Sequence, residues 1–164
     1  MTSPSPRDAT RRIRGLRANA LAAVVMLLIQ YCLGISVNLY STLPASDHGQ
    51  SLFAGFTSAV GDGPMLLSLH ALLGTLLLIT ASAALVRSLR LAATPPIALT
   101  AAALLTIIIA WLAGSAFVGH MRNETSLTMA LGTAVSIFCY ALVIFLVRSS
   151  PQSSSSVSEQ LQGG

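Results

Sequence analysis

The chain has 164 residues, of which 54% are hydrophobic and 9% are charged, and its formal net charge is +4. Soluble domains carry about a quarter charged residues, so this composition argues against an ordinary water-soluble domain. The two cysteines, Cys32 and Cys139, lie inside apolar runs and have no CxxC partner, which argues against a zinc site or a disulfide framework.

Four apolar stretches are each long enough to cross the hydrocarbon core of a bilayer, for which a helix needs about 20 residues. The predicted transmembrane helices cover residues 18–39, 65–86, 97–118 and 126–147. Together they define one transmembrane domain over residues 18–148. We therefore predict an all-α membrane protein, built as an up-down bundle of four transmembrane helices.

The segments on either side of this domain differ in character. Residues 1–17 are a basic segment with five arginines, and the first sixteen residues are expected to be loose. Residues 149–164 are rich in Ser, Gln and Gly, have no apolar face, and are expected to form a disordered tail.

The longest connection lies between the first and second predicted spans and contains an apolar segment from Ser51 to Val60. At ten residues this segment is too short to cross the bilayer, so we expect a short helix in the membrane interface. Phe53 and Phe56 would then lie against lipid headgroups or at the mouth of the bundle.

The arginines assign an orientation to the four spans. Eight of the nine lie before the first span, between the second and third, or after the fourth, and only Arg122 lies on the other side. Cytoplasmic loops carry an excess of basic residues, so both termini are predicted to be cytoplasmic and the protein to lie in the plasma membrane. This placement makes the lipid bilayer the expected partner and argues against nucleic acid.

The second and fourth spans share a sequence pattern. Ser68–Thr75 aligns with Ser126–Thr133 with five of eight positions identical, which places Gly74 opposite Gly132 and His70 opposite Thr128. The first and third spans share a weaker aromatic-x-x-Gly pattern. These matches favour two repeated helical hairpins, with chance similarity among Leu-, Gly- and Thr-rich helices as the alternative.

His70 is the only ionisable side chain well inside a predicted span. Ionisable residues are costly in a membrane, and a neutral imidazole can ligate haem iron, relay a proton or hydrogen-bond across helices. His120 and Met129 lie at a comparable depth, so His–His or His–Met ligation of a haem is one prediction for these three residues. The alternative is a structural histidine bonded to a backbone carbonyl or a hydroxyl.

Gln30, Gly34 and Asn38 follow one another in steps of four along the first span and therefore lie on one narrow stripe. We expect this stripe to face the bundle, where amides bond across helices and glycine admits a close neighbour. The alternative is that it lines a polar substrate or quinone pocket. Further interhelical hydrogen bonds are expected from four hydroxyl side chains: Ser115, Thr128, Thr133 and Ser136.

The sequence resembles small four-helix membrane proteins of actinobacteria that have no assigned function, through Gln30-Tyr-Cys-Leu-Gly34, Asn38-Leu-Tyr40 and Leu69-His70-x-x-x-Gly74. Its layout is also similar to one four-helix half of the haem A synthase family, which implies a haem-ligating histidine at His70. The sequence departs from that family because Thr128 and Met129 stand where a second histidine is implied. The acidic residue before the first histidine and the cysteine pair in the first loop are also missing, so the enzyme activity is not carried over.

No phosphate-binding loop, HExxH, CxxC or GxSxG motif is present, and no paired carboxylates lie within a span. Three hypotheses on function follow. The first is a haem- or quinone-associated redox bundle that uses His70. The others are a non-catalytic subunit or assembly factor of a larger membrane complex, and a small transporter that works as a homo-oligomer.

Overall fold

The computed structural model describes residues 6–40, 51–61, 64–120 and 123–148. These residues form helices and short connecting turns, without a strand in the described ranges. The helices are α1 (Pro6–Tyr40), α2 (Leu52–Gly61), α3 (Met65–Leu89), α4 (Thr94–His120) and α5 (Asn123–Arg148).

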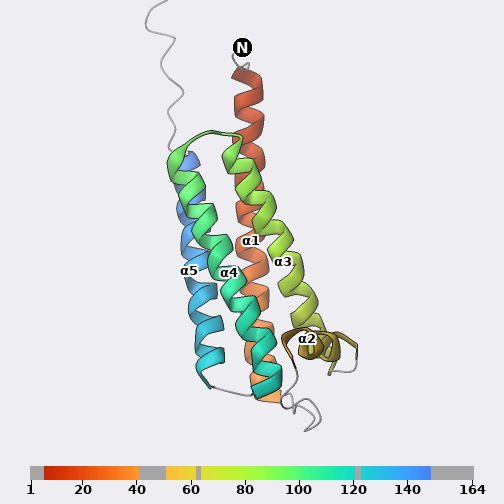
Figure 1. The fold of residues 1–164 in the computed structure, drawn as a ribbon. Helices are drawn as coiled ribbons and strands as arrows, with labels where there is room; N and C mark the ends of the chain where they lie inside the picture. Colours follow the sequence, from red (N-terminus) through yellow and green to blue (C-terminus); the bar gives the residue numbers. More distant parts are fainter. Residues whose placement is uncertain (1–5, 41–50, 62–63, 121–122, 149–164) are drawn as a thin grey trace, which may run out of the picture.

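The four long helices α1, α3, α4 and α5 stand side by side as an up-down bundle, and the short α2 lies across one end of it (Figure 1). Each of the four is long and apolar enough to cross a membrane. The predicted all-α four-helix bundle is therefore confirmed, as is the short helix predicted for the segment from Ser51 to Val60.

Large apolar side chains cover the outside of the bundle. Ile79, Phe138 and Phe145, for example, are each more than 60% exposed, at 62%, 64% and 65%. A continuous apolar surface of this kind is unfavourable in water and is what lipid acyl chains solvate. The chain is therefore a multi-pass integral membrane protein.

We call the two ends of the bundle the α2 end and the arginine end, the latter defined by Arg87, Arg90 and the arginines of the first turns of α1. At the arginine end, α1 projects beyond the turn that joins α3 to α4 (Figure 1). Arg12 Nη1 donates a hydrogen bond to the carbonyl oxygen of Arg90 at 3.1 Å, which ties α1 to the end of α3.

The expectation that the first sixteen residues are loose is wrong for the described part of that segment, because α1 begins at Pro6. Proline is favourable at the start of a helix, and the alanine, leucine and arginine residues that follow are good helix formers. Asp8 in the first turn also complements the helix dipole, and Leu16 is fully buried. The predicted tail, residues 149–164, lies outside the described residues.

The half of the bundle next to the arginine end is packed with small side chains. Five alanines are fully buried there and let the helices approach closely: Ala20, Ala23, Ala81, Ala84 and Ala103. Tyr140 and Val143 of α5, also fully buried, complete this core.

Hydroxyl groups connect neighbouring helices at two places, one buried and one partly buried. Ser88 of α3 lies 2.8 Å from Thr100 of α4, and Thr106 of α4 lies 2.8 Å from Ser136 of α5, in each case between side-chain oxygens. Of the four predicted interhelical hydroxyls, Ser136 makes such a bond. The hydrogen bonds found for the other three, Ser115, Thr128 and Thr133, go to the carbonyl oxygen four residues earlier in their own helix.

The two hairpins, α1–α3 and α4–α5, make corresponding contacts. A Cβ atom built on Gly74 would lie 3.1 Å from Nε2 of Gln30, and one built on Gly132 would lie 3.1 Å from Cβ of Ala110. Gly74 and Gly132 are paired by the match between the second and fourth spans, and Gln30 and Ala110 by the separate match of Tyr31 with Trp111 between the first and third spans. Equivalent glycines thus meet equivalent positions of the neighbouring helix, which supports an internal repeat.

Candidate functional site

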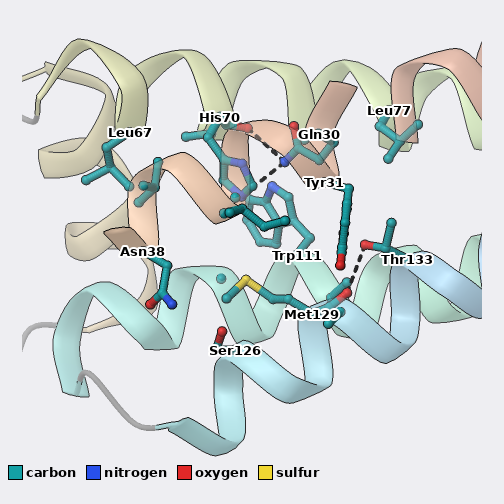
Figure 2. A pocket seen from close by; sticks show the side chains of 18 of the residues that line it. Gln30, Tyr31, Asn38, Leu67, His70, Leu77, Trp111, Ser126, Met129 and Thr133 are labelled. Carbon is teal, nitrogen blue, oxygen red and sulfur yellow. Dashed lines mark hydrogen bonds between the residues drawn. The ribbon is translucent and has the colours of Figure 1, made fainter. Parts of the chain in front are cut away.

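A cavity of about 260 Å³ lies between the long helices in the half of the bundle next to α2 (Figure 2). All five helices contribute to its lining. Leu27, Leu77 and Ile107 close it toward the arginine end, and each of them is at most 3% exposed. Among the described residues that line it there is no Asp, Glu or Arg, so this part of the cavity suits an uncharged molecule.

His70 of α3 and Gln30 of α1 provide the polar contact at this cavity (Figure 2). Gln30 Nε2 donates a hydrogen bond to the backbone carbonyl oxygen of His70 at 3.0 Å. The same amide nitrogen lies 3.2 Å from Nε2 of the His70 ring. The side chain of Gln30 therefore contacts both the backbone and the imidazole ring of His70.

Two buried polar atoms of this pair lack a hydrogen-bond partner within the described part of the chain. They are Nδ1 of His70 and Oε1 of Gln30. Buried polar groups in proteins are nearly always paired, so two unpaired atoms in one contact require an explanation. A bound molecule or an ordered water is the ordinary explanation at a cavity of this size.

Aromatic side chains form part of the cavity lining. Trp111 of α4 and Tyr31 of α1 line it directly (Figure 2). Phe56 of α2 lines it too and packs on Trp111, with ring centroids 5.4 Å apart and an interplanar angle of 46°. The short helix α2 thereby places an aromatic ring at the end of the cavity, which corresponds to the second of the two positions predicted for Phe56, lipid headgroups or the mouth of the bundle.

Two glycines leave space for the side chains of His70 and Gln30. A Cβ atom on Gly34 would lie 3.2 Å from Cε1 of His70, and one on Gly74 would lie 3.1 Å from Nε2 of Gln30. Any larger residue at either position would press on this pair. The glycine of the predicted stripe on the first span therefore serves the site directly.

The other residues singled out from the sequence fall into two groups. Asn38 and Met129 line the cavity, and Met129 Sδ would lie 3.3 Å from a Cβ on Gly114. His120 is the last residue of α4, and its side chain lies outside the described part.

Sequence reasoning singled out His70 and Gln30 separately but missed their contact, and it used Trp111 only as a mark of the repeat. The available signal for Trp111 was its position three residues before Gly114, which matches Tyr31 before Gly34. Comparison with known protein families, curated proteins and solved structures finds no match to this chain. The resemblance to one half of the haem A synthase family therefore stays a prediction.

Proposed function

We propose that the chain binds the ring headgroup of a lipophilic carbonyl compound, with quinones as the representative class, in the cavity next to α2. The observation that carries this proposal is the buried His70–Gln30 pair, with two unpaired polar atoms at a mainly apolar cavity whose described lining holds no charged residue. Small-molecule sites commonly combine an apolar and aromatic lining with a few placed polar groups.

The size and position of the cavity support a compact ring. Its volume of about 260 Å³ lies just below the range of roughly 300–1,000 Å³ that encloses drug-sized ligands. Trp111, Tyr31 and Phe56 offer faces on which a flat ring can stack. Because the bundle is surrounded by lipid, an isoprenoid or alkyl tail on that ring can remain among acyl chains.

We infer that the same geometry favours a compact ring over a haem held by His70. Nε2 of the ring already faces the amide of Gln30, and the adjoining ring atom Cε1 lies close to Gly34 of α1. A porphyrin with its propionates is also much larger than a compact headgroup. Iron ligation by His70 would need the Gln30 contact to break and the helices to separate.

The orientation of the chain follows from the same basic residues that mark the arginine end. We infer that this end, with both termini, faces the cytoplasm of a plasma membrane, since cytoplasmic segments are enriched in arginine. The cavity then lies in the outer half of the bilayer. Fusion of a reporter that is active only outside the membrane to residue 164 should give no activity, and active reporter there would overturn this orientation.

Trp111 provides the test of the cavity, because it is the only tryptophan of the chain and lines the site. Purified protein in nanodiscs is titrated with a short-chain benzoquinone, and the quenching of tryptophan fluorescence is followed. We expect saturable quenching that is weakened in His70→Ala and unchanged in Thr128→Ala. Thr128 is the matched control because it occupies the equivalent repeat position outside the cavity lining.

Non-saturable quenching that is identical in the wild type and His70→Ala would overturn the proposed function. An absorption spectrum of protein produced with ample haem tests the alternative directly. We expect no Soret band. A Soret band that disappears in His70→Ala would show that the site binds a haem and not a carbonyl compound.

A further inference from the structure

We infer that Gln30 holds His70 as the neutral Nδ1–H tautomer, so that the cavity offers a hydrogen-bond donor and selects ligands by an accepting carbonyl oxygen. This inference rests on the proposed function, because it specifies the chemistry of the same site. It assigns Gln30 as a positioning residue and His70 Nδ1 as the donor to the ligand.

The orientation of the Gln30 amide is the first step. Its terminal atom nearest to His70 lies 3.0 Å from a backbone carbonyl oxygen, which can only accept a hydrogen bond. That atom must therefore be the amide nitrogen, because an amide oxygen would face another acceptor. The contact with the backbone fixes which end of the amide faces the histidine.

The tautomer of the imidazole is the second step. The NH₂ group of Gln30 has two hydrogens, of which one is directed to the carbonyl oxygen of His70 and the other can reach Nε2 of the ring at 3.2 Å. A donor facing Nε2 requires a lone pair there. In a neutral imidazole the single proton then lies on Nδ1.

The buried Nδ1–H is the third step. It is buried on the ring edge beside Gly34 and has no acceptor within the described part of the chain, and both His70 and Gly34 line the cavity. A ligand carbonyl oxygen placed at this edge would satisfy it, whereas an iron ion or a second donor would not. The other unpaired atom, Oε1 of Gln30, is itself an acceptor and does not compete for the carbonyl.

The ring nitrogens of His70 can be read directly by ¹⁵N NMR of protein labelled at histidine in nanodiscs. The chain has three histidines, and the His70→Phe variant identifies the His70 signals. We expect a protonated Nδ1 and an unprotonated Nε2 in the wild type. A protonated Nε2 in the neutral wild-type ring would overturn the inference.

Two substitutions of Gln30 test its positioning role. Gln30→Leu removes the donor and is expected to give a mixture of tautomers, and Gln30→Glu provides an acceptor and is expected to move the proton to Nε2. Asn19→Leu is the matched control, because Asn19 also joins α1 to α3 through its amide, donating to the carbonyl oxygen of Thr80 at 3.1 Å, away from the cavity lining. Asn19→Leu should leave the His70 tautomer unchanged. If Gln30→Leu also leaves the tautomer unchanged, Gln30 does not determine it.

Ligand selection is measured by Trp111 quenching with two matched compounds, a short-chain benzoquinone and the dimethyl ether of its hydroquinone. The ether keeps the ring and tail but replaces the carbonyls by weakly accepting oxygens. We expect the wild type to bind the quinone about two- to tenfold more tightly, as one hydrogen bond is worth, and His70→Phe and Gln30→Glu to lose this preference.

Different results would overturn the inferred hydrogen-bond donor and the proposed function. Saturable binding with equal affinity for the quinone and the ether, or with a protonated Nε2, overturns the inferred donor but leaves the cavity as a binding site. Absence of saturable binding overturns the proposed function, and the ligand selection falls with it even where the Nδ1–H tautomer is observed.

Discussion

Gly132 of α5 packs directly against the carbonyl oxygen of Thr106 on α4, which a Cβ atom at this glycine would approach to 3.0 Å. The equivalent glycine of the other hairpin, Gly74, would instead meet the end of the Gln30 side chain at 3.1 Å. A backbone carbonyl cannot move aside without moving its helix, whereas a glutamine side chain can. The same substitution at two related positions should therefore have different effects.

Gly132→Ala is expected to destabilise the fold. Overpacking of this kind costs about 1–3 kcal/mol, and only about 1 kcal/mol is regained by replacing a glycine inside a helix with alanine. Thermal unfolding in a fixed detergent should show a lower midpoint than the wild type. An unchanged or higher midpoint would contradict the close contact with Thr106.

Gly74→Ala is expected to leave the stability of the fold nearly unchanged and to alter the cavity. The added methyl group displaces Gln30 from His70, so saturable quenching of Trp111 by a quinone should weaken while the unfolding midpoint stays near that of the wild type. If Gly74→Ala and Gly132→Ala lower the unfolding midpoint equally, the effect of the added methyl group does not depend on whether its neighbour is a side chain or a backbone carbonyl.

The hydroxyl contact between Thr106 and Ser136 is expected to couple α4 to α5 by about 0.6 kcal/mol, the average for such bonds within membranes. A double-mutant cycle with Thr106→Val and Ser136→Ala measures this coupling as the difference between the double variant and the sum of the single ones. A coupling of zero would mean that each hydroxyl is satisfied by the carbonyl oxygens of its own helix.

Ala92, in the turn between α3 and α4, has a φ angle of 53°, in the left-handed region that favours glycine. Ala92→Gly should therefore raise the free energy of unfolding by about 0.5–1 kcal/mol. Chemical denaturation in mixed micelles measures this change. Ala93→Gly, one residue along the same turn, is the control and should show no gain.

Phe56→Ala removes the ring that packs on Trp111 at the α2 end. We expect Trp111 fluorescence to become more accessible to a water-soluble quencher such as acrylamide. Thr57→Ala on the same helix serves as the control, since Thr57 is exposed and hydrogen-bonds to the carbonyl oxygen of Ala54 in its own helix. Equal quenching in both variants would show that Phe56 does not cover the cavity.

Hydropathy alone was enough to predict the four spans and α2, because the length of an apolar run decides between crossing the bilayer and lying at its surface. The helical extension from Pro6 to Arg17 was missed because this basic segment has no long apolar run that would mark it as a helix. Contacts with α3, such as the bond from Arg12 to the carbonyl of Arg90, are not visible in the sequence of α1.

The individual residues of the candidate site were predictable from the sequence, but the contacts among them were not. His70 was conspicuous as an ionisable residue in a span, and the stripe of Gln30, Gly34 and Asn38 indicated a polar face. Which of these meet depends on the relative rotation and axial shift of α1 and α3. Side chains along the whole length of both helices contribute to that registration, including the buried alanines of the other half of the bundle.

The layer of Leu27, Leu77 and Ile107 gives the cavity one closed side, with buried alanines and Tyr140 beyond it. A guest in the cavity therefore cannot reach the arginine end without unpacking this layer. The described part of one copy is thus closed toward that end, which suits storing, sensing or presenting a molecule in one half of the bilayer. A transport route would have to run between copies or unpack this layer, which sets a clear structural requirement for any role in translocation.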